Sequence, residues 1–202
     1  HRDDQVEAEQ LLGTVRRACL EHQYARERER ILARSDKWSR ELLALRQLGE
    51  VSSKEMLQTL FRRTIEAVSD TLQVETASLM LVEEENLRVV EAIGLPGEVI
   101  GRATVPLGQG ISGHVAQTGK PLLINDINRH ETFRPSRFKK QYSTRSALCV
   151  PLLRAERVLG VLNANNKMSG EEFVESDRDL LATMAAQVAM SIDNARLFAD
   201  ME

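Results

Sequence analysis

The most constraining feature of this sequence is the stretch SALCVPLLRAERVLGVLNANN at positions 146–166, in which two apolar segments flank a polar turn at Arg154 to Arg157. Two such segments joined by a short polar turn predict an antiparallel hairpin of strands. ETASLMLVEE and NLRVVEAIG, separated by the acidic turn Glu83 to Asn86, predict another hairpin. Because a sheet of hairpins must bury its apolar face against another layer, the chain needs helices to cover it.

Amphipathic segments on both sides of the hairpins can supply that cover. SSKEMLQTLFRRTIEAVSDTLQ has apolar residues at helical spacing, and a second helical pattern runs from Ser176 to the end, with Ser176 or Asp177 as the expected N-cap. Between the hairpins, residues 105–120 predict a turn and a short helix ended by Gly119, and residues 120–127 predict a strand. The predicted fold class is α+β, an antiparallel sheet with flanking helices.

Residues 128–145 form a polar stretch that is too long for a simple connection, so we interpret it as a binding lid.

The first 52 residues predict a long helix, because they are rich in Glu, Arg, Ala and Leu and contain no proline. Tyr24, Ile31, Trp38 and Leu45 recur at every seventh position, which is typical of a coiled coil, although charged residues interrupt the seam. We therefore divide the chain into a dimerising helix at 1–52 and a folded domain at 53–202. We expect a homodimer through the N- and C-terminal helices, with a lone solvated helix as the alternative.

Composition excludes several classes of function. A formal net charge of −3 gives no basic field for nucleic acid, and no apolar run is long enough to cross a membrane, so we expect a cytoplasmic protein. Cys19 and Cys149 are too few for a disulfide framework, and we interpret both as free thiols. The four histidines show no metal-ligand spacing, so no metal site is predicted. Nothing in the sequence argues for an enzyme.

GQGISG at positions 108–113 matches the dinucleotide-binding pattern G-x-G-x-x-G. That pattern needs a parallel strand-helix-strand unit and an acidic residue about 20 positions later, whereas these surroundings predict antiparallel hairpins and Asp126 comes too early. Amides around Ile111, Ser112 and Gly113 can still receive a phosphate or another anion at a helix N-terminus. A purely structural turn is the alternative.

Together, GQGISGHVAQTGKPLLINDI, SALCVPLLRAERVLGVLNANNK and the spacing Phe173-x-x-x-Asp177 resemble a GAF domain over residues 53–200. Within that family, Asn166-Lys167 followed by a turn, Phe173 and Asp177 resembles the signature of the regulatory GAF domains of cyclic-nucleotide phosphodiesterases and related adenylyl cyclases. An Asp-Glu pair closes the signature in those relatives, whereas Arg178 follows Asp177 here.

The resemblance implies where a cyclic nucleotide would bind. The implied ligand-binding residues are Ser78, Ala92, Ile93, Ile111, Ser112, Asp126, Phe133, Arg134 and Thr144. Guanine-binding relatives have an aromatic residue and a carboxylate where this chain has Ala92 and Ile93. A carboxylate that accepts two N–H bonds favours guanine, so we expect cAMP to be favoured over cGMP. An adenine nucleotide, another small ligand and no ligand all remain open.

The signature residues Asn166, Lys167, Phe173 and Asp177 have a physical reading of their own. Lys167 ends the last strand and can reach Asp177 at the start of the last helix, while Phe173 fills the apolar space between them. We call this arrangement the clasp, and by resemblance it supports the pocket without touching ligand.

Three functions follow from these features. The first is a non-catalytic GAF sensor that relays a small ligand through dimeric helices to an output domain outside this chain. The second is a ligand-free dimerisation scaffold, which the apolar Ala92 and Ile93 favour. The third is an enzyme like the free methionine sulfoxide reductases, which need several cysteines near the pocket, where this chain has Cys149 alone.

Overall fold

The computed structural model describes residues 53–133 and 146–199, together with isolated helical positions between residues 22 and 33. The rest of the helix predicted for residues 1–52 lies outside the described residues. In chain order the elements are α2 (Ser53–Leu72), β1 (Val74–Glu83), β2 (Asn86–Ile93), the 3-10 turn η1 (Gly97–Val99), β3 (Thr104–Pro106), α3 (Gly110–Thr118), β4 (Leu122–Ile124), β5 (Ala147–Arg154), β6 (Arg157–Lys167) and α4 (Glu175–Ala199).

A six-stranded sheet in the order β3-β2-β1-β6-β5-β4 forms the centre of the fold. Both predicted hairpins are present as β1–β2 and β5–β6, and antiparallel pairing of β1 with β6 joins them. The α+β class with an antiparallel sheet is therefore confirmed. The edge strand β3 was not predicted, because three residues are too few to show an alternating pattern. The strand predicted over residues 120–127 is shorter than expected, and β4 contains Leu122–Ile124 only.

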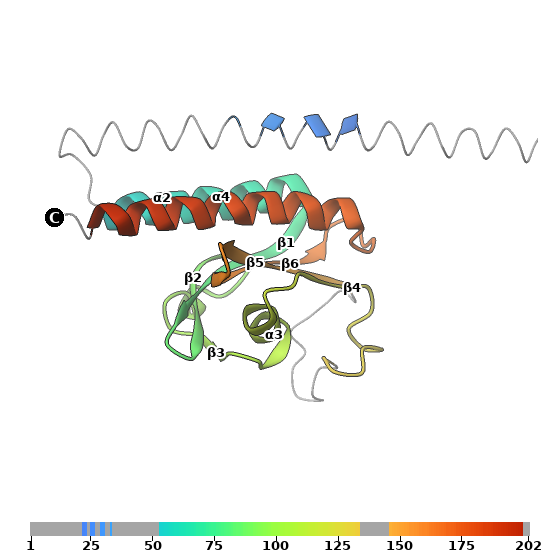
Figure 1. Cartoon of the computed structure of the whole chain (residues 1–202). Helices are drawn as coiled ribbons and strands as arrows, with labels where there is room; N and C mark the ends of the chain where they lie inside the picture. Colours follow the sequence, from blue (N-terminus) through green and yellow to red (C-terminus); the bar gives the residue numbers. More distant parts are fainter. Residues whose placement is uncertain are drawn as a thin grey trace, which may run out of the picture.

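Helices α2 and α4 lie side by side on one face of the sheet (Figure 1). Their apolar stripes face the strands, as the helical spacing predicted, and they bury a core against β1, β5 and β6. The large side chains of this core include Phe61, Ile65, Val68, Leu79, Leu148, Leu152, Leu162, Leu181, Val188 and Ile192. The two helices run in opposite directions, so the start of α2 and the end of α4 lie at the same end of the domain (Figure 1).

Helix α3 lies on the opposite face of the sheet (Figure 1). A second apolar cluster fills the space beneath it and contains Met80, Leu87, Val89, Val115, Ala116, Cys149 and Val161. In the described part of the chain, two long helices cover one face of the sheet, and the short helix α3 with its adjoining loops covers the other. None of the described helices is long and apolar enough to cross a membrane.

Candidate functional site

The face of the sheet under α3 carries one row of cross-strand neighbours that we call the floor row: Ala92, Ser78, Asn163 and Cys149. Ala92 of β2 pairs with Ser78 of β1, Ser78 pairs with Asn163 of β6, and Asn163 pairs with Cys149 of β5. Directly paired residues lie on the same face of a sheet. The floor row therefore extends across four strands. It places the polar side chains of Ser78 and Asn163 among the apolar side chains of this face.

A hydrogen-bonded chain links the floor row to α3. Asn163 Nδ2 donates to Ser78 Oγ at 3.2 Å, and the hydroxyl of Ser112 on α3 donates to Asn163 Oδ1 at 3.0 Å. Asn163 and Ser78 are buried, with 6% and 8% of their surface exposed. Buried polar groups cost stability unless they are paired, so these bonds hold the chain in place. None of the three side chains is charged, which gives the site a neutral hydrogen-bonding surface.

Cys149 lies beside this chain and is 1% exposed. Burial raises the pKa of its thiol far above the ordinary value, and a hydrogen bond with Ser112 opposes that shift only in part. A thiol held neutral is a poor nucleophile. As it stands, Cys149 is a packing residue.

The N-terminus of α3 faces the same region. Its N-cap residue, Gln109, has extended backbone and forms no side-chain capping bond, and the helix ends at Gly119 with φ of 65°, as predicted. Two glycines of GQGISG serve the turn, because Gly108 and Gly110 have φ of +79° and +62°. Since α3 connects strands of an antiparallel sheet, the motif is not a dinucleotide-binding fingerprint.

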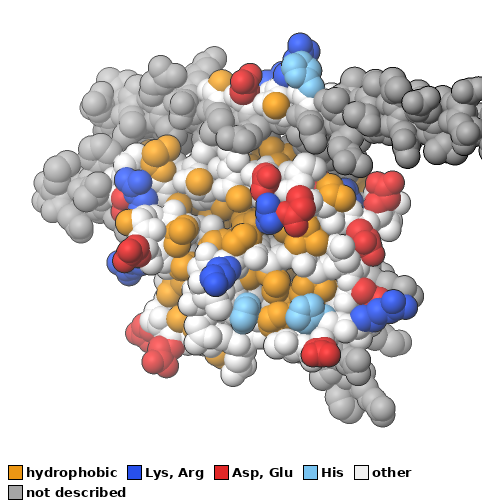
Figure 2. Space-filling model, turned by 45° about the vertical axis from the view of Figure 1, so that its right-hand side comes forward, with side chains coloured by type: hydrophobic (Ala, Val, Ile, Leu, Met, Phe, Trp, Pro, Cys, Tyr) orange, Lys and Arg blue, Asp and Glu red, His pale blue; other side chains and the backbone are white. Residues whose placement is uncertain are grey.

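The segment between β4 and residue 133 contributes an aromatic group. Phe133 lies between two imidazoles, with ring centroids 5.2 Å from His114 of α3 and 4.9 Å from His130. It also packs against an apolar cluster built on Ile124 and Ile127. Figure 2 shows hydrophobic side chains gathered next to two histidines on this side of the molecule. The described residues contain no group of three or more His, Cys, Asp or Glu side chains that could hold a metal ion.

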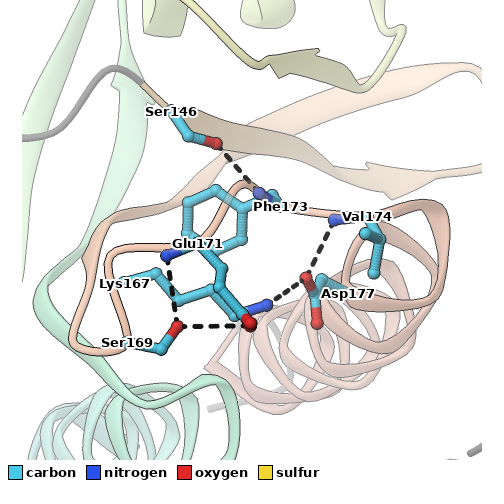
Figure 3. Close-up of polar contacts among 7 residues, drawn as sticks. All are labelled: Ser146, Lys167, Ser169, Glu171, Phe173, Val174 and Asp177. Carbon is cyan, nitrogen blue, oxygen red and sulfur yellow. Dashed lines mark hydrogen bonds and ion pairs between the residues drawn. The ribbon is translucent and has the colours of Figure 1, made fainter.

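The clasp lies at the far end of β6. Lys167 Nζ is 2.8 Å from Asp177 Oδ2, and Asp177 Oδ2 also accepts the N–H of Val174 at 2.9 Å (Figure 3). Phe173 is fully buried, with its ring centroid 5.6 Å from Lys167 Nζ. Asn166 adopts φ of +58°, which turns the chain just before Lys167. The structure therefore brings together the side chains that the sequence paired.

The start of α4 differs from the prediction. The helix begins at Glu175, so neither Ser176 nor Asp177 is the N-cap. Val174 takes the capping position, and Asp177, three residues later, reaches back to the Val174 N–H. This is the returning half of a capping box. Asp177 thus serves the helix start and the ion pair with one oxygen atom.

Ser146 adds a contact that sequence analysis missed. Its hydroxyl oxygen accepts the N–H of Phe173 at 3.0 Å (Figure 3). Ser146 immediately precedes β5, so this bond ties the start of β5 to the turn before α4. A serine at a strand end gives no local signal of such a partner 27 residues away.

Comparison with known proteins decides the family. The family model for the GAF domain matches residues 56–192. The chain belongs to the GAF domain family. The GAF domain of a phosphoenolpyruvate-protein phosphotransferase from Acinetobacter has the same fold, with a TM-score of 0.65 and 24% identity over 82% of this chain and 94% of that one.

Sequence relatives match this chain over a small part of their own length. The dual 3',5'-cyclic-AMP and -GMP phosphodiesterase 11A of Takifugu rubripes is 37% identical over 108 residues, which is 52% of this chain and 12% of the relative. The nitrogen fixation protein AnfA of Azotobacter vinelandii is 27% identical over 124 residues, which is 60% of this chain and 23% of the relative. This chain therefore spans less than a quarter of the length of either relative.

The residues expected to bind ligand in this GAF domain are only partly brought together. Ser78, Ala92, Ile111, Ser112 and Phe133 lie on the α3 side of the sheet. Arg134 and Thr144 lie outside the described residues.

Ile93 and Asp126 fit the expected site less well. Ile93 pairs with Ala77, which belongs to the core on the other face, and 36% of Ile93 is exposed. The Asp126 carboxylate is engaged locally, accepting the N–H of Asn128 at 3.0 Å and lying 3.3 Å from Arg129 Nε. Asn163 was not expected, although an asparagine inside the apolar run VLGVLNANN was a signal that could have drawn attention to it.

Proposed function

We propose that this GAF domain is a non-catalytic regulatory module that binds a small ligand on the α3 side of its sheet. The observation that carries the proposal is the hydrogen-bonded chain Ser78–Asn163–Ser112, in which Ser78 and Asn163 are buried. Ligand sites in proteins combine an apolar lining with a few well-placed polar groups. Here the apolar lining comes from the cluster under α3, and the aromatic ring of Phe133 stands beside it.

We infer that the ligand presents a neutral hydrogen-bonding surface to the floor row. Ser78, Asn163 and Ser112 offer hydroxyl and amide groups, and Ala92 offers no carboxylate for the two N–H groups of guanine. An anionic group of the same ligand would be stabilised by the uncapped N-terminus of α3. A cyclic nucleotide with an adenine base, cAMP, meets both conditions better than cGMP.

A thermal-shift screen tests this proposal. Purified protein is heated with cAMP, cGMP, other nucleotides and common metabolites, since a ligand at 100 times its Kd adds about 2.7 kcal/mol to the free energy of unfolding. We expect cAMP to raise Tm more than cGMP does, and Ser112→Ala to reduce the rise. Thr59→Ala is the matched control, because its hydroxyl bonds only within α2 to the Glu55 carbonyl oxygen at 2.9 Å.

We further propose that the ligand signal passes through the clasp to paired terminal helices. The dimerising helix of residues 1–52 and the domain of residues 53–202 would then form one relay to an output domain elsewhere in the natural protein. Such a relay requires ligand affinities that differ between two helix arrangements. Sedimentation of the full chain and of residues 53–202 tests it, and a full chain that is monomeric at micromolar concentration would remove its basis.

A ligand-free dimerisation scaffold is the second candidate. Arg178 favours it, because phosphodiesterase-type relatives resembling this domain have an acidic residue there, whereas Arg178 here forms ion pairs with Glu175 and Asp179. No change in Tm across the whole panel, together with a dimer in solution, would favour this scaffold over the sensor.

A further inference from the structure

Three of the four floor-row side chains, Ser78, Asn163 and Cys149, are covered in this structure. Cys149 is 1% exposed and its neighbours Asn163 and Ser78 are hardly more accessible. If this face binds a ligand, as the proposed function holds, the ligand reaches these side chains only after something above them moves. The nearest cover is α3, because Ser112 on its first turn touches both Asn163 and Cys149.

Both ends of α3 are glycines with left-handed backbone. Gly108 and Gly110 precede or open the helix with φ of +79° and +62°, and Gly119 closes it with φ of +65°. Glycine adopts many backbone conformations at little cost, so these positions can act as pivots for a rigid displacement of the helix. Apolar contacts through Val115 and Ala116 hold the middle of α3 on the sheet.

Asn163 holds the first turn of α3 by polar contact. Its Oδ1 accepts from Ser112 and its Nδ2 donates to Ser78, so a single amide joins α3, β6 and β1. We propose that Asn163 is a positioning residue, a latch that fastens the first turn of α3 over the floor row, and that release of the Ser112–Asn163 bond opens the floor row.

Cys149 reports this opening without any ligand. Because burial raises its pKa, the thiol is neutral and shielded while α3 is closed, and it reacts with Ellman's reagent only from an open state. Every protein in the experiment carries Cys19→Ser, so that Cys149 is the one thiol of the chain. Labelling rates are measured on the folded full chain, well below its Tm.

We expect Ser112→Ala and Asn163→Ala each to raise the labelling rate by roughly five- to tenfold, since each removes the Ser112–Asn163 hydrogen bond that closes the latch. Ser112→Thr keeps the hydroxyl and should label within about twofold of the parent, a rescue that mere loss of stability would not produce.

Val150→Ala is the matched control for global unfolding. Val150 neighbours Cys149 on β5 but packs in the core under α2 and α4. Its labelling rate should rise only in proportion to its loss of Tm. Equal acceleration in Val150→Ala and Asn163→Ala at equal loss of Tm would overturn the latch. The latch would also be overturned if the folded parent were labelled as fast as the parent unfolded in urea. A labelling rate of Ser112→Thr equal to that of Ser112→Ala would overturn it as well. The labelling experiment contains no ligand, so it can support the latch even if no compound in the thermal-shift screen raises Tm. Conversely, a labelling result that contradicts the latch does not contradict ligand binding.

Discussion

The carboxylate of Asp177 sits 2.8 Å from the ammonium of Lys167 with only 2% of its side chain exposed, whereas Asp193, on the same helix, forms a 2.8 Å pair with Arg154 at 34% exposure. Two ion pairs of equal length thus differ mainly in burial. Water screens the second pair and hardly reaches the first, so their contributions to stability should differ.

Asp177→Ala should lower the free energy of unfolding by roughly 3 kcal/mol, because it leaves the largely buried Lys167 charge, 14% exposed, without this partner and removes the acceptor of the Val174 N–H. Asp193→Ala should cost less than about 1 kcal/mol. Urea unfolding of both variants measures the difference. Equal losses would mean that Lys167 finds water or another partner when Asp177 is absent.

Ser146→Ala should destabilise the domain by about 1–3 kcal/mol, because the buried N–H of Phe173 loses its acceptor. Thr183→Ala is the control, since its exposed hydroxyl bonds only to the Asp179 carbonyl oxygen one turn earlier. It should stay within about 0.5 kcal/mol of the parent. Thermal unfolding checks both variants, and a neutral Ser146→Ala would show that the contact contributes nothing to stability.

Gly160→Ala should destabilise the central strand pair, because an added Cβ would lie 2.1 Å from the Met80 carbonyl oxygen of β1. Overpacking against backbone costs about 1–3 kcal/mol or more. Gly97→Ala meets no atom within 4 Å and should stay within about 0.5 kcal/mol of the parent. Similar Tm values for the two variants would contradict the close approach of β6 to β1.

The buried thiol of Cys149 predicts a loss of stability at alkaline pH. Its pKa is raised in the folded state, whereas an unfolded cysteine has a pKa of about 8.5, so above that pH only the unfolded chain releases the proton. The contribution of this group is complete below about pH 8 and falls by up to about 1.4 kcal/mol per pH unit above it.

Urea unfolding between pH 7.5 and 10 measures this slope, and Cys149→Ala removes it. A Cys149→Ala variant with the same pH dependence as the parent would show that the folded protein also holds a thiolate.

Local patterns predicted the features that depend on neighbouring residues. Alternating apolar runs with polar turns gave both central hairpins, and the spacing from Lys167 to Asp177 is short enough to suggest their pairing. The start of α4 was misplaced because Ser176 and Asp177 are both favourable N-caps, while the actual arrangement uses Asp177 from inside the helix.

The centre of the candidate site escaped prediction because its bonds span long stretches of chain. Asn163 meets Ser112 across 51 residues and Ser78 across 85. Only the register of β1 and β6 places Ser78 beside Asn163 under α3, and no local pattern specifies that register. Ile93 shows the opposite case: the resemblance placed it beside Ala92 in the site, but neighbours along a strand point to opposite faces.

The antiparallel run of α2 and α4 has a consequence for how this domain can be built into a longer polypeptide. The start of α2 and the end of α4 lie at the same end of the fold (Figure 1), so both connections of the domain are on one side. The domain is then attached to a longer polypeptide through these two helix ends. The distance between the segments that precede and follow the domain therefore depends on the positions of the helix ends alone. Lengthening a sheet loop would leave that spacing unchanged, whereas adding one residue to either helix would rotate its continuation by about 100° and advance it by about 1.5 Å.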